Sequence, residues 1–257
     1  MRKEFFIVLL FSVLFWACST ESESIINDSA EAVKENRKPT GASANDLLSN
    51  NIYKKMIVEL AYIEGFEPTE EAKNNFKSFI EERTFKSNGV ELYTKLIPDT
   101  GKEVYTINDI VAIENQYRTY YNTQNTIAVW ALFVNGKSSK DSDSSFVLGT
   151  AYYNTSFVIF EETIRELSNG TFEPERSLLE SSVIHHEFGH ILGLTNLGTP
   201  LQTDHEDADH PKHCNEESCL MYWTAETSQG IGNLFSSNQI PTLDSQCIAD
   251  LQANGGR

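Results

Sequence analysis

Basic side chains are scarce in this sequence. Its 257 residues include 20 Lys and Arg against 37 Asp and Glu, which gives a formal net charge of −17. A surface with this charge repels phosphate backbones and anionic lipid headgroups. We therefore expect no nucleic-acid partner and no electrostatic attachment to a membrane.

The N-terminal apolar run, residues 5–16, is too short to span a bilayer. Arg2 and Lys3 precede it, and a basic start followed by a short apolar run is typical of a signal peptide. We therefore predict a cleaved signal peptide at residues 1–17.

The end of this run, Phe15-Trp16-Ala17-Cys18, resembles a bacterial lipobox. The resemblance implies that Cys18 is the lipid attachment site of an exported protein, held to the membrane by acyl chains only. Ser19 is not the aspartate that commonly retains lipoproteins in the inner membrane, so we expect the outer membrane or cell surface of a Gram-negative bacterium. An ordinary secretory signal with an incidental cysteine is the alternative.

Cysteines are few, and apart from Cys18 only Cys214, Cys219 and Cys247 occur. In an exported protein, three cysteines suggest one disulfide and one free thiol, and the sequence leaves the pairing open. A second metal site is the alternative, although a thiolate site usually needs four ligands and no Cys-x-x-Cys pair is present.

The length suits one sizeable domain, which we place at residues 47–257. The residues before it, 18–46, are rich in Ser, Glu, Asn and Ala and lack aromatic side chains. We expect them to form a flexible tether without a fold.

Strand and helix patterns alternate along the domain. Apolar runs and alternation predict strands at 56–63, 90–97, 126–134, 146–153 and 156–163, and helical spacing predicts helices at 69–84, 107–120, 175–192 and 243–253. Gly193 is a plausible stop for the third helix. The remainder, 195–238, reads as mostly irregular. This order predicts a single α/β domain with a mixed sheet and a closing helix.

The third helix contains His186-Glu187-Phe188-Gly189-His190. Two histidines four residues apart project from successive turns of a helix and can bind one zinc ion. Glu187 is rotated about 100° from His186 and can reach a water on the open side of the metal, where it would act as general base. The alternative is a pair of surface histidines on an amphipathic helix. His185 points away from this stripe and reads as an ordinary polar position.

With Gly193, this motif resembles the extended signature of the metzincin metallopeptidases, although Asn196 occupies the position of their third ligand. The stretch His213 to Met221 resembles the archaemetzincin pattern, in which the third histidine is followed by Cys, four residues, Cys, one residue and Met. This resemblance implies that His213 is the third ligand and that Met221 lies beneath the metal in a methionine turn. It also implies that residues 197–212 are an inserted loop.

From the residues themselves, His205, His210 and Asn196 remain alternatives for the third ligand, and Asp207 is a candidate to orient one of the histidines. Tyr222 is a candidate donor to the oxyanion of the reaction. The Cys-x-x-Cys that completes a second zinc site in archaemetzincins is missing, so we expect one catalytic Zn²⁺ ion.

The resemblance implies a zincin domain in which a twisted sheet packs on the active-site helix. The implied function is a zinc-dependent endopeptidase acting on peptides or proteins, whose sheet edge at 146–153 pairs with an extended substrate. The alternative is a surface lipoprotein that uses a structural metal site to bind a glycan or protein without catalysis. The sequence leaves the substrate and the oligomeric state open.

Overall fold

The computed structural model describes residues 30–228 and 236–257. A five-stranded sheet with the order β2-β1-β4-β7-β6 organises them. Four strands are parallel: β1 (Lys55–Ile63), β2 (Val90–Ile97), β4 (Thr126–Phe133) and β7 (Ser156–Ile159). The fifth, β6 (Gly149–Tyr153), is antiparallel to β7 and forms one edge. A separate short sheet pairs β3 (Val104–Tyr105) with β5 (Lys137–Ser138). The predicted α/β fold with a mixed sheet is confirmed.

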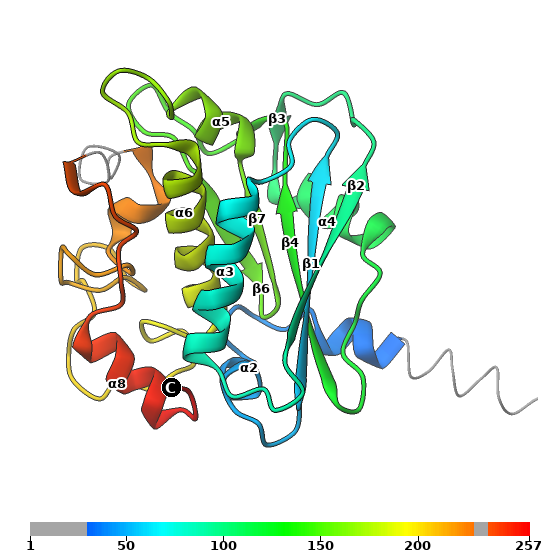
Figure 1. Ribbon diagram of the computed structural model, residues 1–257, viewed down its shortest axis with the longest axis vertical. Helices are drawn as coiled ribbons and strands as arrows, with labels where there is room; N and C mark the ends of the chain where they lie inside the picture. Colours follow the sequence, from blue (N-terminus) through cyan, green and yellow to red (C-terminus); the bar gives the residue numbers. More distant parts are fainter. Residues whose placement is uncertain (1–29, 229–235) are drawn as a thin grey trace, which may run out of the picture.

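Helices cover both faces of the sheet, as Figure 1 shows. α3 (Glu70–Arg83) and α6 (Arg176–Ile191) lie on one face, and α4 (Ile107–Tyr117) lies on the other. Side chains of β1 alternate between two apolar cores, because successive residues of a strand point to opposite faces. Met56 and Leu60 belong to the core beneath α3 and α6, whereas Ala61 and Ile63 belong to the core beneath α4.

Local capping sets where the helices on the two faces begin. The Thr69 side chain accepts a hydrogen bond from the Ala72 backbone N–H at 3.2 Å at the start of α3. Thr106 and Asp109 form a capping box at the start of α4. The predicted helix 107–120 is too long, since α4 gives way to extended backbone at Arg118.

The strand predicted at 156–163 is also too long. β7 ends at Ile159, and α5 (Glu161–Glu166) follows at once. Two glutamates, Glu161 and Glu162, occupy the first turn of α5. The apolar run that suggested a longer strand is buried in both elements, so its hydrophobicity alone could not mark the boundary.

Helix α6, which carries His186, Glu187 and His190, ends where the sequence predicted. Gly193 follows its C-cap with φ of +81°, a left-handed conformation that glycine adopts without strain. Beyond it, the described residues form little regular structure until α8 (Ser245–Ala253), apart from the 3₁₀ turn η1 (Trp223–Glu226).

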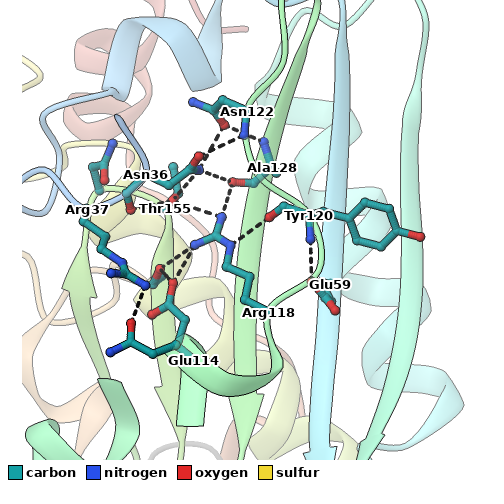
Figure 2. Close-up of polar contacts among 12 residues, drawn as sticks. Asn36, Arg37, Glu59, Glu114, Arg118, Tyr120, Asn122, Ala128 and Thr155 are labelled. Carbon is teal, nitrogen blue, oxygen red and sulfur yellow. Dashed lines mark hydrogen bonds and ion pairs between the residues drawn. The ribbon is translucent and has the colours of Figure 1, made fainter. Parts of the chain in front are cut away.

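The expected tether, 18–46, is wrong for its described part from Asn36 onward. Asn36 is fully buried, and its side-chain amide donates to the Ala128 carbonyl and the Thr155 hydroxyl, each at 2.9 Å (Figure 2). The short helix α2 (Ala44–Leu48) then packs Leu47 and Leu48 into the core. Polar composition suggested disorder, but these polar groups are satisfied by the sheet.

The same region holds a buried ion pair, also drawn in Figure 2. The Arg118 guanidinium donates to a Glu114 carboxylate oxygen at 2.6 Å and to the Ala128 carbonyl at 2.8 Å, and both side chains are fully buried. Arg118 therefore joins the end of α4 to the N-terminal segment through β4.

The predicted signal peptide, residues 1–17, and the predicted lipid attachment site, Cys18, lie outside the described residues. Within the described ranges, none of the helices combines the length and apolar character needed to cross a membrane.

Candidate metal centre

The two helical histidines and His213 come together in space. His186 and His190 lie on successive turns of α6, with ring centroids 4.7 Å apart. The ring centroid of His213 lies 5.4 Å from that of His186 and 5.1 Å from that of His190. Each of the three offers a ring nitrogen within 4.8 Å of the others. Two of the three are almost completely buried, so the cluster is held inside the fold.

A backbone carbonyl sets the orientation of His186. Its Nδ1 lies 2.8 Å from the Leu220 carbonyl oxygen, and because a carbonyl can only accept, Nδ1 carries the proton. In the neutral ring the lone pair is then on Nε2, the nitrogen available to a metal. Three neutral imidazoles are also a donor set that zinc accepts at catalytic sites, so these residues fit the ion that the sequence implied.

The alternatives for the third ligand lie elsewhere. His205 Nε2 is 2.8 Å from an Asp250 carboxylate oxygen, and its ring is fully buried away from the cluster. His210 stacks on Trp223, with ring centroids 4.1 Å apart. Asn196 donates to Glu206 and adopts a left-handed backbone conformation with φ of +64°.

Asp207, the candidate orienting carboxylate, contacts His210 rather than a clustered histidine. Its carboxylate lies 3.0 Å from His210 Nδ1 and accepts the backbone N–H of Asp209 at 2.9 Å. The latter bond is the largest cause of the lowered pKa of Asp207. Asp207 also donates its backbone N–H to the His213 carbonyl at 2.8 Å, so its main chain fixes the segment that carries His213.

The Met221 side chain lies against Gly189 of α6. A Cβ atom at Gly189 would come within 2.4 Å of the Met221 sulfur, so a larger residue at this helix position would force the Met221 side chain to shift. The Cys214 N–H donates to the Met221 carbonyl at 2.8 Å and ties Met221 to the residue after His213. The methionine therefore packs between the two segments that supply the three histidines.

Glu187 is fully buried next to the start of the edge strand β6. A Cβ atom at Gly149 would lie 2.7 Å from a Glu187 carboxylate oxygen, so the missing side chain leaves room for this carboxylate. The edge strand thus begins beside the residue predicted to act as base. No sequence pattern marked Gly149 or the Leu220 carbonyl, because their roles arise from the close approach of backbone segments.

A cavity of about 570 Å³ adjoins this region. Ser182, one turn before His186 on α6, and Tyr222, directly after Met221, both line it. Tyr222 is half-buried, and its backbone N–H donates to the Cys219 carbonyl at 3.0 Å.

His185 points away from the cluster, as expected, but it is buried rather than an ordinary polar position. Its ring stacks on Phe79 of α3 with centroids 4.3 Å apart. Burial disfavours the charged form and lowers the pKa of His185 to about 4. His185 therefore joins α6 to α3 as a neutral ring.

The three described cysteines are free and buried, so the expected disulfide is absent among the described residues. Hydrogen bonds from the thiols of Cys219 and Cys247 lower the pKa of Cys214. His205, Cys214, Asp244 and Cys247 offer ligand atoms within 4.8 Å of one another. The sequence raised a metal site at the cysteines as an alternative, but it did not connect His205 or Asp244 with them.

No family model matches the chain, and no curated protein matches it. Among solved structures, it is similar to an archaemetzincin from Methanopyrus kandleri, with a TM-score of 0.52 and 16% identity over 78% of this chain and 96% of that chain. Metalloproteinase-II from Bacteroides fragilis matches with a TM-score of 0.42 and 13% identity, over 87% of this chain and 60% of that chain. The first likeness shows that the chain has an archaemetzincin-like metallopeptidase fold.

Proposed function

We propose that this protein is a zinc-dependent endopeptidase that cuts peptide bonds with Glu187 as general base. The observation that carries the proposal is the convergence of three ring nitrogens within 4.8 Å beside this buried carboxylate. A purely structural zinc site would have four protein ligands and no base beside it. The metallopeptidase fold supports the same class of activity.

His186, His190 and His213 would hold the ion. Bound zinc supplies two things at such a site: it lowers the pKa of a coordinated water toward about 7 and polarises a carbonyl oxygen. The Leu220 carbonyl keeps the His186 ring in the tautomer that can bind. Glu187 would accept the proton of the attacking water and return it to the leaving amine.

The edge strand β6 would position the substrate. It lies at the end of the sheet, begins beside Glu187 and packs against α6. An extended peptide can add to such an edge through main-chain hydrogen bonds, which carry little sequence preference. The cavity lined by Ser182 and Tyr222 would take a substrate side chain, and the Tyr222 hydroxyl would donate to the oxyanion.

A digest of an unfolded protein substrate tests the proposal. The purified protein should cleave casein, and a chelator should abolish cleavage until zinc is restored. Glu187→Gln should lower turnover at least about 100-fold while zinc content stays unchanged, because a general base contributes roughly 10²–10⁴-fold. Glu81→Gln, on the exposed face of α3, is the matched control and should retain activity.

Activity that survives Glu187→Gln would end the peptidase proposal. A wild-type protein that binds zinc at this cluster but cleaves no peptide would favour the alternative predicted from the sequence, in which a metal-stabilised lipoprotein binds a glycan or protein without catalysis. Equal zinc content in His213→Ala and wild type would show that the third ligand is another residue.

Export and attachment through Cys18 stay predictions, since these residues lie outside the described part of the chain. In a Gram-negative host, Cys18→Ser should move the protein from the membrane fraction to the soluble periplasmic fraction. An unchanged distribution would contradict the lipid anchor.

A further inference from the structure

A second group of buried donors lies apart from the three histidines, in the part of the chain that follows α6. The imidazole of His205 is fully buried, and its Nδ1 lies 3.4 Å from the Cys214 sulfur. The sulfurs of Cys219 and Cys247 are 3.7 Å apart and equally enclosed. We infer that four side chains form a second, structural zinc site: His205, Cys214, Cys219 and Cys247.

The separations between these atoms match tetrahedral zinc. With Zn–S bonds of about 2.3 Å and Zn–N bonds of about 2.0–2.1 Å, two sulfurs at one ion lie about 3.8 Å apart and a sulfur and a nitrogen about 3.6 Å apart. The observed 3.7 Å between Cys219 and Cys247 and 3.4 Å between Cys214 and His205 are close to both values. A disulfide would need its sulfurs about 2.05 Å apart.

The surroundings suit thiolates. The Cys219 sulfur accepts the backbone N–H groups of Met221 and Asp244, each at 3.4 Å. Such donors stabilise negative charge on sulfur, and three thiolates with one histidine are a common donor set of structural zinc. Three thiols crowded into an apolar core without a metal would gain little, since they hydrogen-bond weakly.

Asp250 sets the orientation of His205. The Asp250 carboxylate lies 2.8 Å from His205 Nε2, so this nitrogen carries the proton and Nδ1 faces the sulfurs with its lone pair. A carboxylate behind a metal-binding histidine fixes both its tautomer and its rotation. Asp250 itself belongs to α8 and is fully buried.

Asp244 also lies near this group, and we assign it a different role. Its carboxylate accepts the Cys247 N–H at 2.9 Å and caps the start of α8. Because this oxygen already serves the helix, Cys219 is the better fourth donor. The expectation of a single zinc ion rested on the missing Cys-x-x-Cys. In this proposal His205 and Cys247 supply the two donors that the missing pair would have provided.

The site would join three segments that have little regular structure of their own. His205 comes from the loop after α6, Cys214 and Cys219 flank the turn before Met221, and Cys247 lies in α8. Cys214 directly follows His213, so the second metal would also hold the third histidine of the first cluster in place.

Cobalt binding to the purified full-length protein tests the inference independently of any peptidase activity. Cobalt held by thiolates gives a thiolate-to-metal charge-transfer band in the near ultraviolet, which three histidines cannot give. Wild type should bind two equivalents and show the band. His190→Ala should bind one equivalent and keep the band, whereas Cys247→Ser should lose it.

Two further variants test whether a lost cobalt signal reflects a lost ligand or a lost fold. Asp250→Asn keeps all four donors and should weaken cobalt binding at the second site about 10–100-fold, with the band recovered at saturation. Asp244→Asn can still cap α8 and should keep two equivalents.

Three outcomes would overturn the site: a wild-type protein without the band, a Cys219–Cys247 disulfide in freshly purified protein, or loss of the second equivalent in Asp244→Asn but not in Cys219→Ser. Failure of casein cleavage would leave this result untouched, because the band reports only thiolate ligation.

Discussion

The contact between Gly189 and Met221 yields a quantitative prediction, because two opposing effects of one substitution can be compared. Gly189→Ala in the interior of α6 should stabilise the helix by about 1 kcal/mol through helix propensity alone. The new methyl group, however, would lie 2.4 Å from the Met221 sulfur and 3.2 Å from its terminal carbon. Met221 is fully buried, so it cannot move aside into solvent. Overpacking of this kind costs about 1–3 kcal/mol.

In the wild-type background the cost of overpacking should therefore exceed the gain in helix propensity. Gly189→Ala should lower the free energy of unfolding by up to about 2 kcal/mol. In a Met221→Ala background the obstructing atoms are gone, so the same substitution should raise it by about 1 kcal/mol. Met221→Ala alone should cost about 2–5 kcal/mol, which a domain of ordinary stability can tolerate.

Urea denaturation of the four proteins in chelator measures this cycle without a contribution from metal binding. Zinc affinity is the second readout, and we expect Gly189→Ala to weaken it because His186 and His190 flank the displaced turn. The reasoning is refuted if Gly189→Ala is equally stabilising in both backgrounds, since the methionine would then not lie against the helix.

Three other predictions follow from contacts elsewhere in the molecule. His213→Ala should lower zinc affinity at the first cluster by more than about 100-fold in a competition titration, whereas His210→Ala should leave it unchanged. Burial, followed by the charge of Glu180, raises the pKa of Glu161 well above its usual value, so the folded state keeps a proton that the unfolded chain releases above about pH 4.3. Urea midpoints should therefore show wild type losing stability relative to Glu161→Gln as the pH rises above about 4.3, and parallel profiles would contradict this. Asn36→Ala leaves buried backbone groups without partners and should lower the free energy of unfolding by about 1–3 kcal/mol per lost contact. Urea denaturation measures this change, and a value within about 0.5 kcal/mol of wild type would indicate a loosely packed N-terminal segment.

Local patterns in the sequence were sufficient for most of the secondary structure. The Thr69 cap, the Gly193 stop and the apolar strands of the sheet depend on neighbouring residues, so they could be read directly. The two predicted boundaries that failed lie at Arg118, where the side chain forms a buried ion pair, and after Ile159, where α5 follows at once; hydrophobicity reports neither.

The spacing of His186, Glu187 and His190 by itself determined a metal-binding arrangement, because helix geometry places residues four apart on one face. The sequence could only rank candidates for the third histidine. The folded loop places them differently: it brings His213 to α6 and directs His205 toward the cysteines, which depends on backbone contacts between segments far apart in the sequence. The same holds for the second cluster, in which only Cys214 and Cys219 share a sequence motif, while His205 and Cys247 come from two other segments.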